Sequence, residues 1–294
     1  MVASPHVSVS VPALALTSAL LSAAATVLIR HGLVRHGAYT GFWINLVTGT
    51  VCLWTAVLFT GGLGHPTLRA LLLFVLAGLI GTVAGRLTRF IAIEQVGASI
   101  TAGFMNVTPF VSSGLAILVL GERLTVPIVL GTVVIVSGTT LLSTGGRKLG
   151  VRPAQLVLPA VSAACFGIVA ILRKLALGGM DAVPGTAVNV TTAFVSFTSF
   201  LLATGQGAAM ACRGRSLVYF VIAGVFENLS VFLVVVALGM GTVSVVAPLQ
   251  NVTPIFVLFF SLVFLRGIEA LNARVIGGTV LIVAGAWLIT ALGH

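Results

Sequence analysis

Glu227 is an acidic residue at the centre of a long apolar segment, residues 216–238, with Asn228 beside it. An ionised side chain at the middle of a lipid bilayer costs at least about 2.5 kcal/mol on insertion scales, so it must pair with a cation, face water or take up a proton. A carboxylate that gains and loses a proton at this depth is suited to coupling solute movement to a proton gradient. A structural ion pair with Arg86 or Arg89 is the alternative.

Arg86 and Arg89 lie three residues apart, on one face of the helix expected for the apolar segment 70–93. Arg86 lies about 7 Å from the centre of that helix at 1.5 Å per residue. Arg89 is close enough to the end for its head group to reach the membrane boundary. An arginine near a transport path can bind a carboxylate or phosphate through two hydrogen bonds. Arg86 is therefore the more informative residue, and it suits an amino acid or an organic anion.

The tetrapeptide Asn-Val-Thr-Pro occurs twice, at residues 106–109 and 251–254, each time in the middle of an apolar segment. Pro109 and Pro254 each remove one helix hydrogen bond and strain the preceding turn, and Pro248 adds a second break to the later segment. Carbonyl groups freed inside a membrane need polar partners. The polar residues beside the two breaks are Asn106, Thr108, Gln250, Asn251 and Thr253.

Helix breaks inside a membrane are tolerated where they face protein or a wet cavity. We expect the two breaks to line a central substrate path and to offer carbonyl and amide groups to a polar ligand, as discontinuous helices do in transporters. The alternative is a pair of kinked helices whose Asn and Thr side chains only satisfy their own backbone.

A membrane enzyme would need a catalytic or metal-binding constellation, and the sequence contains none. All five histidines fall outside the apolar segments, Asp181 is the only aspartate, and neither an HExxH helix nor a P-loop is present. Cys52, Cys165 and Cys212 lie far apart and form neither a disulfide framework nor a metal signature. We therefore expect no enzymatic activity, no cofactor, no metal and no use of ATP.

The composition indicates an all-α integral membrane protein. Of the 294 residues, 59% are hydrophobic and only 7% are charged, and the mean hydropathy is +1.22, whereas soluble domains carry about 25% charged residues. A helix needs about 20 apolar residues to cross the hydrocarbon core, and we expect ten such transmembrane helices. They are 11–29, 40–62, 70–93, 98–120, 125–143, 154–177, 183–204, 216–238, 243–265 and 271–291.

The net charge of +10 comes from Lys and Arg residues near the ends of these segments, so membrane topology explains it and no nucleic-acid partner is expected. With the N-terminus outside, nine of these residues fall inside and four outside, leaving out the two in segment 70–93. The positive-inside rule then favours both chain termini outside. The nine are Arg30, Arg35, Arg147, Lys148, Arg152, Arg213, Arg215, Arg266 and Arg274, and the four are Arg69, Arg123, Arg173 and Lys174.

The chain consists of two copies of one five-helix unit, residues 11–143 and 154–291. The two Asn-Val-Thr-Pro copies are 145 residues apart, and other matches keep nearly the same register. Because each unit has an odd number of helices, the second enters the membrane from the opposite face, which predicts inverted repeats like those of secondary transporters. The matches pair Arg30, Gly41, Asn45 and Thr48 with Lys174, Gly185, Asn189 and Thr192, and Glu122, Leu124, Gly131, Thr132 and Gly138 with Glu269, Leu271, Gly278, Thr279 and Gly285.

The chain resembles the EamA-type members of the drug/metabolite transporter superfamily, which have ten helices in two five-helix repeats. The resemblance rests on a fourth helix with a central proline, the Leu-Gly-Glu-Arg-Leu-Thr turn at residues 120–125, and a fifth helix with glycines seven apart. In the second copy, residues 265–269 depart from the Leu-Gly-Glu pattern but retain the glutamate. The resemblance implies transport of small organic molecules, such as amino acids, sugars, nucleosides or drugs, often outward across the cytoplasmic membrane.

These observations predict a secondary transporter of the cell membrane that moves small polar metabolites or drugs, in the export direction and with protons as a coupling ion. Its partners are then a small-molecule substrate and membrane lipid. A facilitator that needs no gradient and a lipid-carrier flippase remain alternatives within transport, and a membrane scaffold or sensor is an alternative outside it. Ten helices can form a complete path in one chain, so a monomer and a homodimer both remain open.

Two further patterns concern packing. Glu94, Glu122 and Glu269 lie at segment ends, where a carboxylate can cap the N-terminus of a following helix or meet Arg123 or Arg274. Several glycines mark helix faces where two backbones can approach closely, with sliding during alternating access as a further consequence. They are Gly78, Gly81, Gly85, Gly131, Gly138, Gly278 and Gly285.

Overall fold

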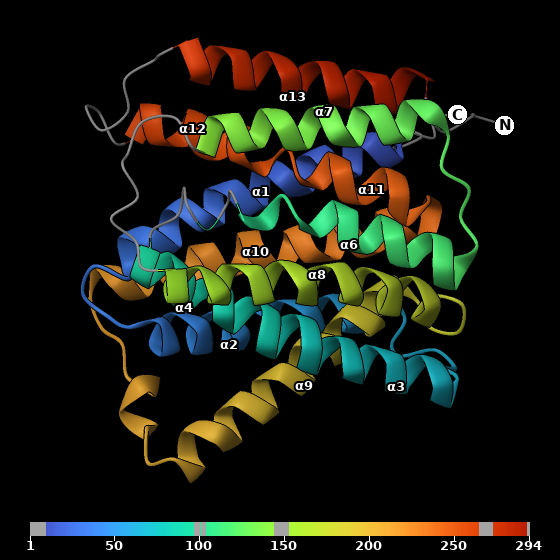
Figure 1. The fold of residues 1–294 in the computed structure, drawn as a ribbon. Helices are drawn as coiled ribbons and strands as arrows, with labels where there is room; N and C mark the ends of the chain where they lie inside the picture. The colour runs from blue at the N-terminus through green and yellow to red at the C-terminus, as the bar shows by residue number, and fades with distance from the viewer. Residues whose placement is uncertain (1–9, 97–100, 102–103, 144–152, 265–272, 293–294) are drawn as a thin grey trace, which may run out of the picture.

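The computed structural model describes residues 10–96, 101, 104–143, 153–264 and 273–292, and every regular element within these ranges is a helix (Figure 1). The elements are α1 (Val11–Gly32), α2 (Ala38–Phe59), α3 (Leu68–Ala77), η1 (Gly78–Arg86), α4 (Leu87–Val96), α6 (Thr108–Leu115), η2 (Ala116–Leu120), α7 (Val126–Ser143), η3 (Pro153–Leu156), α8 (Val157–Ala176), α9 (Ala182–Ala203), η4 (Gly207–Met210), α10 (Arg215–Met240), α11 (Val243–Gln250), α12 (Thr253–Phe264) and α13 (Ala273–Leu292). The segments η1 and η2 are π-helical, and η3 and η4 are short 3₁₀ turns.

Six of the helices are long and apolar enough to cross a membrane. They correspond to the first, second, third, sixth, seventh and eighth of the expected segments, which confirms a multi-pass, all-α membrane protein. The other four expected segments contain shorter apolar helices, Thr108–Leu120, Val126–Leu141, Val243–Val257 and Gly277–Leu292. Large apolar side chains such as Leu58, Phe59 and Leu118 are about four-fifths exposed. Such a surface suits lipid, because lipid tails solvate apolar side chains as well as a protein core does.

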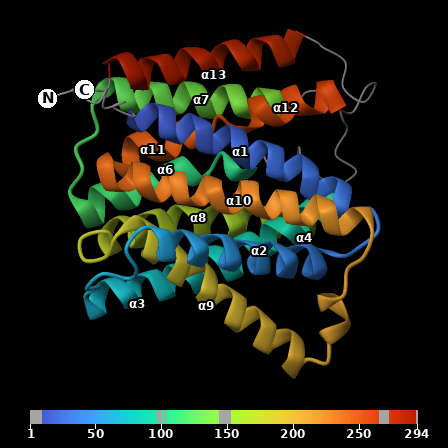
Figure 2. The same cartoon turned by 180° about the vertical axis from the view of Figure 1, so that it is seen from behind.

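The helices form a bundle with α1 and α10 packed along each other at its centre. Both views place α7 and α13 side by side at one edge and α3 with α9 at the opposite edge (Figures 1 and 2). The face of α1 that meets α10 carries small buried residues, among them Ala15 and Ser18. Small side chains let the two backbones approach closely, which is how helices gain packing energy in a membrane.

The glycine faces expected from the sequence are confirmed at two helix contacts. A Cβ atom on Gly78 of η1 would lie 2.6 Å from the backbone oxygen of Asn189 in α9. A Cβ atom on Gly131 of α7 would lie 2.8 Å from the backbone oxygen of Gly285 in α13. Real Cβ atoms do not come this close to backbone atoms, so only glycine permits these approaches.

Both Asn-Val-Thr-Pro sequences interrupt a helix, as expected, but the form of the break differs. The chain turns at Asn106 and Asn251, and new helices begin with the Thr-Pro pairs that follow. Pro109 and Pro254 therefore occupy the first turn of α6 and α12, where a missing N–H removes no helix hydrogen bond. The prediction that each proline removes a helix hydrogen bond and strains the preceding turn is therefore wrong. The second break expected at Pro248 is also wrong, because that residue lies inside α11.

Contacts of α2 with α10 recur between α9 and the α3–η1 helix. Gly41 faces the ring of Phe220, and its repeat counterpart Gly185 faces the ring of Phe74. Thr48 faces Gly224, and its counterpart Thr192 faces Gly78 in the same manner. Within this stretch, the second helix of each repeat therefore packs on the third helix of the other.

Some sequence expectations fall outside the described residues. They concern the second copy of the Leu-Gly-Glu turn, residues 265–269 with Arg266 and Glu269, and the basic residues Arg147, Lys148 and Arg152. They stay predictions.

Candidate functional site

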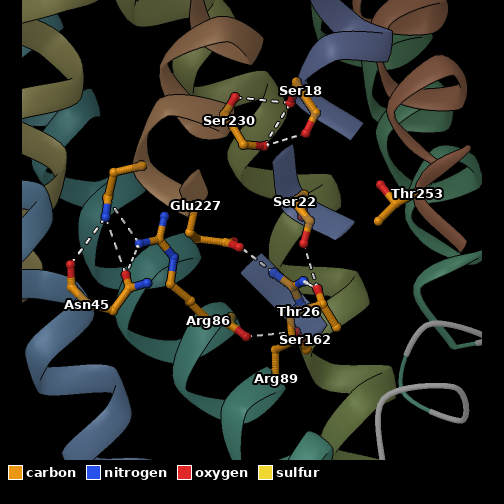
Figure 3. A network of polar contacts seen from close by, with 12 residues as sticks. Ser18, Ser22, Thr26, Asn45, Arg86, Arg89, Ser162, Glu227, Ser230 and Thr253 are labelled. Atoms are coloured by element: carbon orange, nitrogen blue, oxygen red, sulfur yellow. Dashed lines mark hydrogen bonds and ion pairs between the residues drawn. The ribbon is translucent and has the colours of Figure 1, made fainter. Parts of the chain in front are cut away.

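A buried ion pair joins α4 to α10. Nη1 of Arg89 lies 2.7 Å from Oε1 of Glu227, and the residues are 8% and 4% exposed, respectively. Nη2 of Arg89 also donates to the hydroxyl of Thr26 on α1 (Figure 3). The pair expected for Glu227 is therefore present, with Arg89 rather than Arg86 as the partner. The expectation that Arg89 reaches the membrane boundary is wrong, because its side chain turns inward to this carboxylate.

Hydroxyl groups on α1 extend this polar region along the contact with α10. Thr26 donates to the backbone oxygen of Ser22 at 2.7 Å, one turn earlier on the same helix. The Ser18 and Ser230 hydroxyls lie 2.9 Å apart, and each also donates to the other residue's backbone oxygen (Figure 3). These bonds satisfy buried hydroxyl groups and hold α1 against α10 near Glu227.

Arg86 is 1% exposed and contacts two asparagines. Its Nη1 donates to Oδ1 of Asn45 at 2.9 Å (Figure 3) and to Oδ1 of Asn228 at 3.2 Å. Nδ2 of Asn228 in turn donates to the backbone oxygens of Asn45 and Gly224. Arg86 and Asn228 were expected at a common site and do contact each other, whereas Asn45 was noted only as a repeat match.

One extra residue in the helix of Arg86 accounts for the π-helical segment η1. Residues 74–78, Phe-Val-Leu-Ala-Gly, match residues 220–224, Phe-Val-Ile-Ala-Gly, at a spacing of 146. Ala92 and Ala237 further along are only 145 apart, so the first copy holds one residue more in between. A π-helix bonds residue i to i+5 and so takes in an added residue, and such bulges are frequent at functional sites. The second copy, α10, is α-helical throughout.

Arg173 on α8 makes a second arginine–asparagine contact that the sequence did not predict. Its Nη2 donates to Oδ1 of Asn189 on α9 at 2.8 Å, and the residue is 6% exposed. Thr82 of η1 also donates to Oδ1 of Asn189, at 3.4 Å. The sequence placed Arg173 at a membrane boundary because it lies in the last turn of its segment. In the sequence, the match of Asn45 with Asn189 between the two repeats was the signal that could have pointed to these asparagines as site residues.

The two helix breaks meet each other but form a separate group. Nδ2 of Asn251 donates to Oδ1 of Asn106 at 3.1 Å, so these matching residues of the two repeats are in contact. Thr108 donates to the backbone oxygen of Ala163 at 3.2 Å. Thr253 donates to the backbone oxygen of Gln250 at 2.7 Å and lies apart from the arginine network in Figure 3. The structure thus brings the expected residues together as two polar groups rather than one.

Charged residues at the helix ends fix the turn between α10 and α11. The carboxylate of Glu122 accepts hydrogen bonds from the backbone N–H groups of Val243 and Ser244 at 2.8 and 3.0 Å. Nζ of Lys174 donates to the backbone oxygens of Leu238 and Gly241, both at 2.7 Å. Glu122 therefore caps a helix N-terminus, as expected in kind, but the helix is α11 of the other repeat rather than the helix that follows Glu122 in sequence.

Replacing Glu122 by Gln is expected to lower the free energy of unfolding by about 1–2 kcal/mol. The amide keeps one acceptor oxygen, so one of the two N–H groups at the start of α11 loses its partner and the charge is lost. The measurement is the thermal unfolding temperature of the purified protein. Glu94→Gln is the control, because Glu94 is exposed at the end of α4 and should change stability by less than about 0.5 kcal/mol. Equal unfolding temperatures for both variants would contradict the capping role.

The comparisons with known proteins agree with this architecture. The profile of the EamA-like transporter family matches the chain twice, at residues 10–144 and 154–291. A solved structure described only as the crystal structure of a protein is 16% identical, with a TM-score of 0.77 over 96% of this chain and 97% of that one. This likeness shows that the two proteins have the same fold. Among curated proteins none matches at a significant level.

The double match and the apolar helices define the class of the protein as a multi-pass membrane transporter of the drug/metabolite type. The chain belongs to the EamA-like transporter family, with the family sequence present twice.

Proposed function

We propose that this protein is a proton-coupled secondary transporter that exports small organic metabolites across the cytoplasmic membrane. The observation that carries the proposal is the buried Arg89–Glu227 pair, which joins helices of the two repeats. One carboxylate oxygen of Glu227 bonds to Arg89, while the other, Oε2, is buried without a hydrogen-bond partner. A carboxylate with one uncommitted oxygen can accept a proton there.

Protonation of Glu227 would cancel the charge that holds Arg89. Among the described residues, the guanidinium would then keep its bond to Thr26 alone, and a buried cation without a counter-charge is unfavourable in a membrane interior. The energetic balance between two arrangements of α1, α4 and α10 would therefore change with the proton. A transporter needs such a two-state element, whose equilibrium the coupling ion biases.

The contact pattern supports ten membrane-spanning helices in two inverted repeats. Asn45 bonds to Asn228, and its counterpart Asn189 bonds to Thr82, which precedes Asn228 by 146 residues, the spacing of the matched stretch 74–78 with 220–224. The matching residues Asn106 and Asn251 bond directly to each other. A twofold axis between the repeats produces both kinds of contact. In transporters with inverted repeats, alternating access arises when the two repeats exchange conformations around a fixed site.

Release of metabolites from proteoliposomes tests the proposal. Vesicles are loaded with a deproteinised extract of small metabolites, and the released compounds are identified by mass spectrometry, with and without an acidic outside medium. At least one compound should leave faster than from protein-free vesicles, and the proton gradient should accelerate its release. Glu227→Gln should abolish that acceleration, because the amide cannot take up the proton, and Glu94→Gln should preserve it.

Two outcomes would redirect the proposal. If release by the wild-type protein does not depend on the proton gradient, the protein is a facilitator and the Arg89–Glu227 pair is a structural element. Release no faster than from protein-free vesicles would overturn export of metabolites and leave a lipid-carrier flippase as the transport function to test.

A further inference from the structure

The described interior holds more buried positive than negative charge. Its buried charged side chains are Arg86, Arg89, Arg173 and Glu227. Glu227 pairs with Arg89, so neither Arg86 nor Arg173 has a carboxylate partner among the described residues. Both arginines instead donate to the neutral amide oxygens of asparagines. A buried guanidinium without a counter-charge is unfavourable. Arg86 and Arg173 therefore lower the stability of the fold, and other interactions must offset that loss.

The unused donors of these residues point to a negatively charged ligand. Four of their N–H groups are buried without a hydrogen-bond partner within the described structure: Nε of Arg86, Nε of Arg173, and Nδ2 of Asn45 and Asn189. Native proteins leave few such groups, and each asks for an explanation. Charged and neutral N–H donors grouped in this way are suited to the oxygens of a carboxylate or phosphate.

The two arginine–asparagine pairs contact the same stretch of η1. Thr82 donates to Asn189, the partner of Arg173, and Arg86 itself donates to Asn45. Thr82 and Arg86 are four residues apart, a rise of about 6 Å or less along the helix. The two pairs are thus close enough for one small molecule to reach both.

We propose that the transported compound is a small organic dianion, and that Arg86 with Asn45 and Arg173 with Asn189 bind its two negatively charged groups. This inference rests on the proposed transport function and names the substrate class. Two negative charges match the two uncompensated arginines. A zwitterion such as an amino acid brings no net charge and would leave that excess in place.

Binding of defined compounds to the purified protein tests the inference. The probes are succinate and glutarate as dianions with two separate carboxylates, serine as a zwitterion, glucose as a neutral compound and tetraphenylphosphonium as a cation. The readout is the shift in unfolding temperature with concentration, from which a Kd is obtained. At least one of the two dianions should stabilise the wild-type protein, and the other three compounds should not.

Substitutions assign the effect to the site. Arg86→Gln and Arg173→Gln should each raise the Kd of the dianion at least about tenfold, because each removes a charged partner from a buried contact. Arg69→Gln, which removes an exposed charge from the first turn of α3, should change it less than about twofold. Without ligand, Arg86→Gln should unfold at or above the wild-type temperature, because it removes an uncompensated buried charge. Loss of folding in that variant would overturn the inference and make Arg86 a structural residue.

The outcomes separate this inference from the proposed transport. Stabilisation by serine, glucose or tetraphenylphosphonium without stabilisation by either dianion overturns the dianion site, as does the absence of any binding. Release of a zwitterion or cation from the metabolite-loaded vesicles leaves transport intact and also overturns the site. Dianion binding that depends on both arginines, together with no release of any compound, supports the site and overturns metabolite export.

Discussion

Glu227→Ala is expected to destabilise the protein by about 3–5 kcal/mol, which is among the largest effects of any single substitution in the chain. Removing one partner of a buried ion pair leaves the other as an uncompensated charge. Arg89 is 8% exposed, and within the described structure its other hydrogen bond is to the neutral hydroxyl of Thr26, so no other charge there can replace the carboxylate. The unfolding temperature of the purified protein in detergent measures the loss.

Replacing both partners by methionine should restore most of that stability. Apolar residues of similar volume need no counter-charge, and exchanges of this kind in buried pairs are often neutral or stabilising. We therefore expect Arg89→Met/Glu227→Met to unfold within a few degrees of wild type, while Arg89→Met and Glu227→Met alone unfold well below it. The difference between the double variant and the sum of the single variants gives the coupling energy of the pair.

Transport by the double variant separates structure from function. A pair that only holds α4 against α10 is replaceable by methionines, and gradient-driven release should then return together with stability. A pair that takes up the coupling proton is not replaceable, so the double variant should be stable without any response to the gradient. If the Glu227→Ala protein were as stable as wild type, the argument that Arg89 is left as an uncompensated buried charge would be wrong.

Much of the fold could be predicted from composition and spacing alone. The six long helices, the interruption at each Asn-Val-Thr-Pro sequence and the close glycine contacts follow from apolar length, proline chemistry and the absence of a side chain. Glu227 was expected to pair with a cation, face water or take up a proton, because a charge at that depth is costly, and the structure pairs it with Arg89. These features depend on residues that are close together in the sequence, so a single sequence is enough to predict them.

The partners within the site could not be predicted, because they depend on geometry between distant helices. The sequence offered both Arg86 and Arg89 as partners of Glu227 and favoured Arg86 as the deeper residue, whereas the π-helical segment η1 and the packing against α10 decide that Arg89 meets it. Arg173 looked like a boundary residue, because helix position reveals depth and not which way a long side chain turns. The one extra residue in the third helix of the first repeat was visible in the sequence. That it is taken up as the π-helical segment η1 could be learned only from the backbone hydrogen bonds of the structure.

The crossing of α7 and α13 is the second place where a single substitution should have a large effect. A Cβ atom on Gly285 would lie 2.7 Å from the backbone oxygen of Gly131, 2.8 Å from Cγ1 of Ile135 and 2.9 Å from its backbone nitrogen. Two of these atoms belong to the backbone and cannot move aside, so Gly285→Ala must push the helices apart. Because α13 makes most of its described contacts with α7, little else holds it in the bundle.

We expect Gly285→Ala to cost about 1–3 kcal/mol, the usual range for overpacking a close contact, although alanine favours a helix more than glycine does. Gly277→Ala is the matched control on the same helix, since among the described residues its Cβ atom would meet Cδ2 of Leu141 alone, at 3.6 Å. That variant should be neutral or slightly stabilising. The unfolding temperatures of the two proteins make the comparison, and equal values would show that α13 is free to adjust its position.

Combining the two glycine substitutions at the crossing gives a sharper test. Gly131→Ala places a Cβ atom 2.5 Å from Cγ1 of Ile289 and 2.8 Å from the backbone oxygen of Gly285, so it also requires the helices to separate. Once one alanine has moved the helices apart, the second meets less resistance. The double variant should therefore lose less stability than the sum of the two single variants, as expected for residues in direct contact. Strictly additive losses would indicate that each alanine is accommodated locally, without any separation of α7 from α13.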